Sequence, residues 1–179
     1  MNFSHYRETV LSYHKMLGGT KYPNDTTDRL IRFQDELKEK REYNKFTTFK
    51  SNVDAMVVIR KCRIFSFCEH HLLPFYGYAS IAYIPDGKIL GLSKFQRIVD
   101  KFASRPTLQE NLTQEIADFI DMILKPRGVA VATNCQHSCM FGRGIQNTDS
   151  FVNVQSLLGL FQNPDVKSEF LNRIGRDFN

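Results

Sequence analysis

The sequence predicts a mixed α+β fold in which an antiparallel sheet carries helices on one face. The first observation behind this prediction is the order of patterns along the chain: helices, strands, two helices, strands and a final helix. The second is the concentration of β-branched and aromatic residues in the central segments, which is typical of strands. The third is a length of 179 residues with 42% hydrophobic and 24% charged residues, which suits one globular unit.

The first 45 residues predict two helices and a connector. Residues 1–17 carry apolar side chains at alternating steps of three and four, the spacing of an amphipathic helix, and Gly18-Gly19 ends it. The second helix begins with Asp25 or Thr26 as its N-cap. Its expected buried stripe consists of Leu30, Phe33 and Leu37. The charged residues 38–45 predict a connector, so we expect residues 1–45 to form a helical segment before a domain of residues 46–179.

The rest of the chain predicts strands around a helical pair. Strand patterns occupy the segments 46–50, 55–67, 76–84, 128–139 and 151–161, and residues 89–92 are a short candidate partner strand. Ser93 can cap the first helix of the pair, whose inner face contains Phe95, Ile98, Val99 and Phe102. Thr107 and Glu110 fit a capping box that opens the second helix, which ends at "KPRG". Residues 164–174 predict a closing helix.

Charge and hydropathy limit the partners and the location. The formal net charge of +5 is too mild to indicate a nucleic-acid partner, but it suits a small polyanionic substrate. The sequence contains no run of about 18 apolar residues, so it predicts no membrane-spanning helix. The opening "MNFSHYRETV" lacks the apolar core of a signal peptide, so we expect a cytosolic protein. Its four cysteines are then expected to be thiols or metal ligands.

Two short motifs, "CEHH" at 68–71 and "CQHSC" at 135–139, gather three of the five histidines beside three of the four cysteines. Both lie at a strand or its end, and adjacent antiparallel strands could bring them together. Zinc prefers cysteine sulfur and histidine nitrogen. Cys68 and His71 have the spacing of a turn, while His137 and Cys139 would share one strand face. This supplies more ligands than a three-ligand catalytic zinc needs. A closed structural zinc site and buried thiols without metal are the alternatives.

A second group of side chains is basic: Lys94, Arg97, Arg143 and Arg29. Arginine forks and helix N-termini bind phosphates, so these residues are candidates for a phosphate site. The alternative is that they are solvated surface charges. Glu110 likewise has a structural alternative, because the capping box already explains it.

Taken together, these residues resemble GTP cyclohydrolase I, the zinc-dependent type. The matching motifs are "TTDRL", "CEHHLLPF", "GLSK", "QE-LT" and "H-CM--RG", and the likeness runs from about residue 25 to the closing helix. The resemblance implies a tunnelling fold with a catalytic domain at residues 46–179. It also implies five-membered barrels, two of which stack into a homodecamer with active sites between subunits. The implied reaction converts GTP and water into 7,8-dihydroneopterin triphosphate and formate.

The resemblance also implies a role for each candidate residue. The zinc ligands would be Cys68, His71 and Cys139, which frees His137 to protonate N7 of the guanine while the imidazole ring opens. His70 and Ser93 would act at the ribose, where protons must be shuttled. Glu110 would accept hydrogen bonds from the guanine N1–H and 2-amino group, with Gln109 beside it. The triphosphate would be bound by Lys94, Arg97, Arg143 and Arg29.

Some positions depart from the family pattern. Ser104 stands where the family usually has an arginine, and Pro106 stands where it has a non-proline residue. Thr26-Thr27 replaces a usual Thr-Pro, and Cys62 and Cys135 are unexpected thiols, which we interpret as packing residues. In a regular strand Cys135 would share a face with Cys139 and could approach the metal. Three alternatives remain open at this stage: another tunnelling-fold enzyme, a non-catalytic nucleotide-binding protein with a structural zinc, and an enzyme arrested after ring opening.

Overall fold

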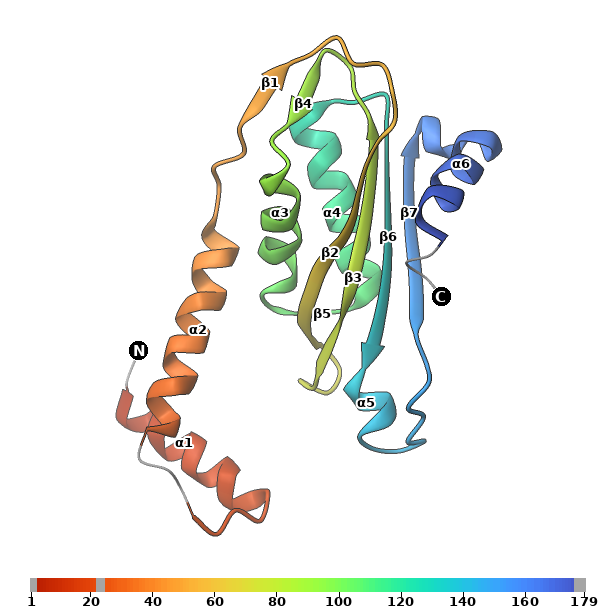
Figure 1. Ribbon diagram of the computed structural model, residues 1–179. Coiled ribbons are helices and arrows are strands. Elements are labelled where there is room, and N and C mark those ends of the chain that lie inside the picture. Colours follow the sequence, from red (N-terminus) through yellow and green to blue (C-terminus); the bar gives the residue numbers. More distant parts are fainter. Residues whose placement is uncertain (1–2, 22–24, 176–179) are drawn as a thin grey trace. The chain divides into compact units, whose positions relative to one another are not determined.

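The computed structural model describes residues 3–21 and 25–175, and a five-stranded sheet forms the centre of its larger unit (Figure 1). The strand order is β5-β2-β3-β6-β7. The bounds are β2 Val57–Cys68, β3 Pro74–Ile84, β5 Pro106–Thr107, β6 Gly128–His137 and β7 Val152–Gly159. All neighbours are antiparallel except β5, which runs parallel to β2 for two residues. The predicted antiparallel sheet is therefore confirmed.

The chain divides into two units, Met1–Glu39 and Lys40–Asn179. The first contains α1 (Phe3–Met16) and most of α2 (Thr26–Glu42), so both predicted helices are confirmed; the first two residues of the predicted range lie outside the described residues. Gly18, at a φ of +80°, follows α1 as expected of a helix-ending glycine. Two expectations about α2 were wrong. It extends into the predicted connector, and Leu30 is 37% exposed rather than part of a buried stripe.

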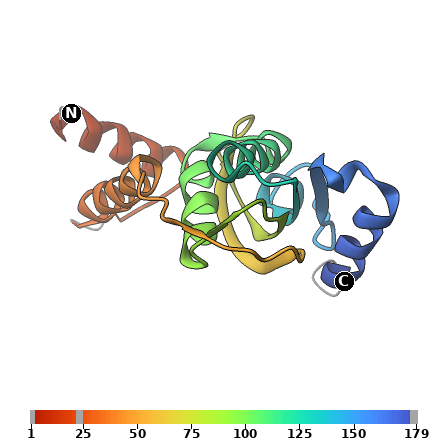
Figure 2. The same cartoon turned by 90° about the horizontal axis from the view of Figure 1, so that it is seen from above.

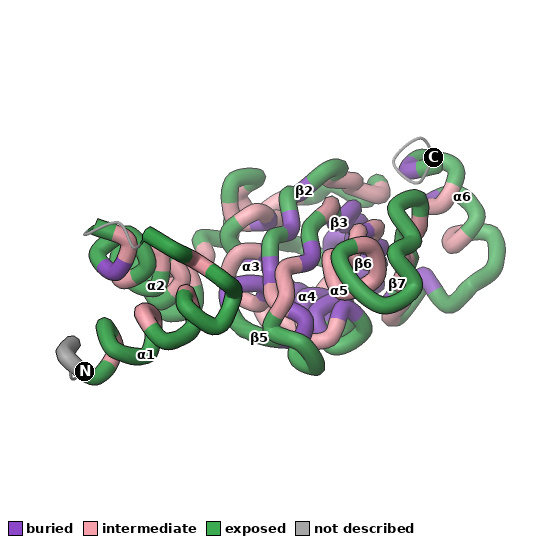
Figure 3. Tube along the Cα trace, turned by 90° about the horizontal axis from the view of Figure 1, so that it is seen from below, coloured by how far each residue is buried: buried purple, intermediate pink, exposed green. Residues whose placement is uncertain are grey.

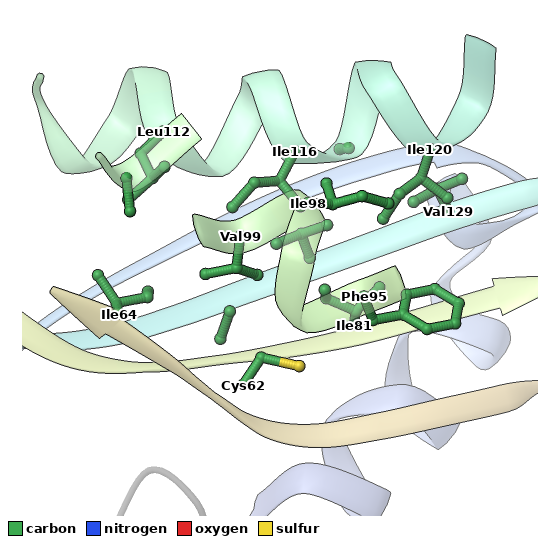
Figure 4. Packing of buried hydrophobic residues seen from close by; sticks show 14 of the residues in the cluster. Cys62, Ile64, Ile81, Phe95, Ile98, Val99, Leu112, Ile116, Ile120 and Val129 are labelled. Atoms are coloured by element: carbon green, nitrogen blue, oxygen red, sulfur yellow. The ribbon is translucent and has the colours of Figure 1, made fainter. Parts of the chain in front are cut away.

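Helices α3 (Ser93–Ala103) and α4 (Gln109–Leu124) cover one face of the sheet. They lie side by side over the curved strands in Figure 2. Figure 3 shows the buried residues gathered where these two helices meet β3 and β6. In Figure 4, Ile98 of α3 and Ile116 of α4 point toward Ile81 on the sheet, and all three are fully buried. The removal of these apolar side chains from water is the main stabilising contribution of this layer.

A smaller apolar layer covers the opposite face. There α6 (Pro164–Ile174) contributes Phe170 and Ile174, which pack with Ala82 of β3 and Ala130 of β6. Successive side chains of a strand point to opposite faces, so Ile81 joins the main core while Ala82 joins this layer. The helical pair thus lies on one face as predicted, and the closing helix adds a layer on the other face.

Several local details differ from the predictions. The strand expected over 128–139 ends at His137, where the short helix α5 (Ser138–Phe141) begins, and the last strand ends at Gly159 before the 3₁₀ turn η1 (Leu160–Gln162). The candidate strand at 89–92 is found as β4 (Lys88–Leu90), paired with β1 (Thr48–Lys50) in a separate ribbon. Among the described residues, no helix is long and apolar enough to cross a bilayer.

Both predicted N-caps of the helical pair are wrong. Ser93 is already the first residue of α3, and the position before it, Leu92, makes no side-chain cap. Thr107 belongs to β5, and its hydroxyl donates to the Leu108 carbonyl, so the capping box does not form. Leu108 precedes α4 without a side-chain cap. Glu110 in the first turn of α4 is therefore free of the structural role that the capping box would have given it.

Candidate active site and metal centre

The "CEHH" motif forms the turn between β2 and β3. Cys68 is the last residue of β2, and its carbonyl accepts from the backbone N–H groups of His71 at 3.2 Å and Leu72 at 2.8 Å. This single helical turn folds the histidine back over the cysteine. As a result, Nδ1 of His71 lies 3.6 Å from Sγ of Cys68.

The "CQHSC" motif reaches the same place from β6. In the register of β3 with β6, Phe75 pairs with His137, so β6 ends beside the β2–β3 turn. The Ser138 hydroxyl donates to the Pro74 carbonyl at 2.5 Å, which holds the start of α5 against β3. Cys139 is therefore presented from a helical turn. The prediction that His137 and Cys139 share one strand face was wrong, whereas the predicted meeting of the two motifs is confirmed.

The ligand atoms of Cys68, His71 and Cys139 all lie within 4.8 Å of one another, and this is the group of described residues that could hold a metal ion. In a tetrahedral zinc site with usual bond lengths, a sulfur and a nitrogen ligand lie about 3.6 Å apart. The Cys68–His71 separation of 3.6 Å matches that value. Cys62 and Cys135 lie instead in the hydrophobic core, as packing residues. The donor atoms present thus fit a borderline-soft divalent ion.

A pocket of about 180 Å³ opens beside this group. It is lined from the β2–β3 turn, from the start of α4 and from the end of β6. Seven of the candidate residues line it: Cys68, His70, His71, Gln109, Glu110, His137 and Cys139. Thr107, Leu108, Met140 and Val152 complete the lining. The pocket therefore brings the candidate metal ligands together with the candidate proton donors and with Glu110, the candidate for guanine binding.

The imidazole of His137 is fixed from two sides. Its Nε2 lies 2.8 Å from Oε1 of Gln109, and its ring stacks on Phe75 with centroids 4.6 Å apart and planes 9° from parallel. Burial lowers the pKa of His137, and the nearby Glu110 carboxylate opposes part of that shift. The position of this ring is therefore set by the folded chain before any ligand enters.

The neighbouring Cys68 thiol disfavours ionisation of Cys139 in the metal group. Burial raises the pKa of Cys139, the neighbouring Cys68 raises it further, and Arg143 acts in the opposite direction. A divalent cation would remove this conflict by stabilising both thiolates. Arg143 lies at the rim of the group, with Nη1 3.2 Å from Nε2 of His71.

The candidate phosphate residues of α3 lie away from this pocket within one chain. Gln96 of α3 hydrogen-bonds to the backbone of Arg63, five residues before Cys68, which is about 17 Å along a strand. Lys94 donates to the Tyr43 hydroxyl at 2.8 Å. Ser93, Lys94 and Arg97 therefore do not join the pocket of their own chain.

The other candidate cation and the departures have ordinary local partners. Arg29, in the N-terminal unit, pairs with Asp25 at 2.5 Å. Ser104 is 2% exposed at the end of α3, and its carbonyl accepts from Nη1 of Arg41 at 2.7 Å. Pro106 opens β5, where it pairs with Phe67. Both unusual residues thus fit the backbone that surrounds them.

The structure adds two residues that sequence reasoning missed. Thr113 of α4 and Thr133 of β6 are fully buried and hydrogen-bonded to Gln109 or to each other. The available signal was a threonine inside the apolar strand "GVAVATN". Such a residue must find a partner when it is buried.

The chain is similar to known proteins over most of its length. A model of the family "GTP cyclohydrolase I" matches residues 19–175. GTP cyclohydrolase 1 of Sulfurihydrogenibium sp. is 45% identical over 153 residues, which cover 84% of this chain and 81% of that protein. GTP cyclohydrolase 1 1 of Pseudomonas syringae pv. tomato is 50% identical over 129 residues, which cover 72% of this chain and 69% of that protein.

A solved structure of the archaeosine synthase QueF-Like in the apo form was also matched. It is 23% identical, with a TM-score of 0.48, and covers 62% of this chain and 97% of that chain. A likeness at this level adds nothing about function.

Proposed function

This chain belongs to the GTP cyclohydrolase I family, and we propose that it hydrolyses GTP to 7,8-dihydroneopterin triphosphate and formate. The observation that carries the proposal is the pocket in which Cys68, His71 and Cys139 meet beside His137 and Glu110. A structural zinc site would not need those last two residues. A catalytic site needs a proton donor and a group that recognises the base.

We propose Zn²⁺ as the cofactor, held by Cys68, His71 and Cys139. Two sulfurs and one nitrogen are a ligand set of catalytic zinc, which keeps a fourth position open. When bound, the ion would supply Lewis-acid chemistry and lower the pKa of a water molecule to about 7. The support for this assignment is the donor set and its spacing.

Glu110 is proposed to select guanine. Its carboxylate, at the pocket wall in the first turn of α4, can accept from both the N1–H and the 2-amino group of the base. Adenine presents no such pair of donors, so the carboxylate facing it would remain unpaired.

His137 is proposed to deliver the proton to N7 as the imidazole ring of the substrate opens. Its ring plane is set by Phe75 and its Nε2 is engaged by Gln109, so one geometry is presented to the substrate. Positioned general acids contribute about 10²- to 10⁴-fold to rate. His70, an exposed residue of the pocket lining, and Ser93 are proposed to move protons at the ribose.

The complete site is proposed to form between subunits of a homodecamer. A pocket of about 180 Å³ is smaller than the ~300–1,000 Å³ usual for small-molecule sites. Lys94 and Arg97 lie away from the pocket of their own chain, so we propose that they bind the triphosphate at a neighbouring subunit, together with Arg143 and Arg29. Among the described strands β7 has a partner on one side only, and such an edge can join another sheet.

Residues 1–45 are proposed as a helical segment added to a catalytic domain of residues 46–179.

Two experiments test these proposals. Zinc-loaded protein and GTP should yield formate and a pterin that fluoresces after oxidation; a formamidopyrimidine without formate would instead identify an enzyme arrested after ring opening. For the assembly, Cys139→Ser and Lys94→Glu subunits would be mixed. If sites are shared, mixed oligomers regain part of the activity that each variant lacks. A mass equal to one chain, 20.8 kDa, would contradict the shared site.

A further inference from the structure

A buried polar chain connects α4 to the imidazole of His137. Gln109, only 1% exposed, lies at its centre. Its Nε2 is 2.9 Å from the Thr133 hydroxyl and 2.9 Å from the Val152 carbonyl, and its Oε1 is 2.8 Å from Nε2 of His137. The series of hydrogen bonds continues to Thr113. Its hydroxyl contacts the Thr133 hydroxyl at 2.8 Å and the backbone carbonyl of Gln109 at 2.7 Å. Both threonines are fully buried, so no solvent competes for these bonds.

The hydrogen-bonding protons of Thr113, Thr133 and Gln109 each have one possible position. The Thr113 hydroxyl must donate to the Gln109 carbonyl, because a carbonyl oxygen can only accept. Its single proton is then used, so Thr133 donates in the contact between the two hydroxyls. Thr133 has no proton left and can only accept from Gln109. The Val152 carbonyl also only accepts, so Gln109 must turn its NH₂ group toward these two oxygens.

The orientation of the Gln109 amide determines which ring nitrogen of His137 carries a proton. With the NH₂ group directed at Thr133 and Val152, Oε1 faces His137 and can only accept, so Nε2 of His137 must carry a proton. We propose that Thr133 and Thr113 are positioning residues: through Gln109 they keep the proton on Nε2 of His137, so that Nδ1 can take a proton from the attacking water and deliver it to N7 of the guanine. This inference rests on the proposed function, in which His137 transfers a proton.

The same hydrogen bonds change the role that we assign to Gln109, which the sequence predicted to lie beside the guanine. Both N–H groups of its amide are engaged by Thr133 and Val152, so the side chain has no donor left for a guanine base. We therefore place Gln109 with the positioning residues rather than with the substrate contacts. Glu110, which lines the pocket, remains the residue that reads the base.

Removal of the Thr133 hydroxyl should weaken the hold on the amide, because the Val152 carbonyl is then the nearest acceptor that still orients the NH₂ group of Gln109. In a fraction of the molecules Gln109 should then rotate and direct its NH₂ group at His137, which would move the histidine proton to Nδ1 in that fraction. Because proton transfer by a positioned group is worth about 10²- to 10⁴-fold, and Nδ1 of the rotated fraction cannot take up a proton, we expect kcat to fall by about 3- to 10-fold. KM for GTP should change by less than about threefold, because neither threonine is among the residues that line the pocket.

The first test uses Thr133→Val, which keeps the shape and removes the hydroxyl. Thr133→Ser restores the hydroxyl and should restore kcat. Ser156→Ala is the matched control, because Ser156 is a buried hydroxyl on the neighbouring strand β7 that bonds to Gln114, outside this chain. If kcat of Thr133→Val equals that of the wild type, or if the serine variant does not recover, the positioning role is overturned. If the valine variant does not fold, Thr113→Val and Thr113→Ser provide the same comparison.

The second test reads the tautomer without turnover. In the full-length holoenzyme labelled with ¹⁵N-histidine, long-range imidazole spectra distinguish Nε2–H from Nδ1–H, and His137→Gln identifies the signal. The wild type should show Nε2–H at His137, and Thr133→Val should show an additional Nδ1–H signal. A wild-type Nδ1–H signal would overturn the inference. If the wild-type protein forms no formate, the proposed function fails, but the spectra still test the hydrogen-bond chain.

Discussion

Replacing Gly77 by alanine should disturb the fold and the active site together. Gly77 lies on β3 and pairs with Cys135 on β6, two residues before His137. A methyl group there would lie 2.0 Å from the Asn134 carbonyl oxygen and 2.7 Å from Cα of Cys135. Both are backbone atoms, which cannot turn aside as a flexible side chain can. The position therefore requires glycine because the neighbouring strand approaches so closely.

The expected magnitude follows from these distances. Real Cβ atoms essentially never approach other heavy atoms within 3.0 Å, so β6 must retreat by at least about 1 Å. Forcing extra volume into a well-packed site costs about 1–3 kcal/mol, and a clash with backbone belongs at the upper end. A loss of about 3 kcal/mol lowers Tm by about 6–12 °C in a chain of this size. A shift of about 1 Å at His137 should also lower kcat/KM by about 100-fold.

Thermal unfolding at fixed protein concentration and steady-state formate release measure the two effects. Gly175→Ala is the control, because an added methyl group there meets nothing within 4 Å. It should change the free energy of unfolding by no more than about 0.5 kcal/mol. If Gly77→Ala keeps the Tm and activity of the wild type, β3 and β6 cannot approach as closely as described, and the argument from their register to the site fails.

Three further predictions concern the metal site, the cysteines and the phosphate site. Cys139→Ser should lose bound zinc and activity together, and stoichiometric zinc retained in the variant would show that another residue binds the ion. In thiol labelling near pH 8, zinc should protect Cys68 and Cys139, while Cys62 and Cys135 stay unreactive with or without zinc, because burial raises their pKa values to about 11 and about 12. Fast labelling of all four thiols in the folded apo protein would contradict this. Lys94→Ala should raise KM for GTP about 10-fold, as expected for one charge-assisted bond to phosphate, with unchanged zinc content; an equal effect on guanosine would show that Lys94 does not bind phosphate.

Much of the fold could be predicted because its signals are local. Hydrophobic spacing located the helical pair, and β-branched runs located the long strands, because each element buries one face. The metal group could also be predicted from the sequence, since Cys68 ends β2, Cys139 follows the end of β6, and both strands pair with β3.

What failed depended on contacts between distant segments. Thr107 fits a capping box locally, but backbone pairing with Cys68 makes it part of β5 instead. Cys139 has strand spacing from His137, but the chain turns into α5 at Ser138. The partners of Thr133 could not be predicted, because Gln109 and Thr113 lie on α4, far away in the sequence.

The most direct test of the central claim is a metal titration of the GTP reaction. Protein stripped with a chelator would be given increasing zinc, and formate and pterin would be measured at each step. No product is expected without metal, and product formation should then rise and level off at one zinc per chain, with Cys68→Ser inactive throughout. Formate and pterin formed at the full rate by the stripped protein, or full zinc binding without any product, would contradict this expectation.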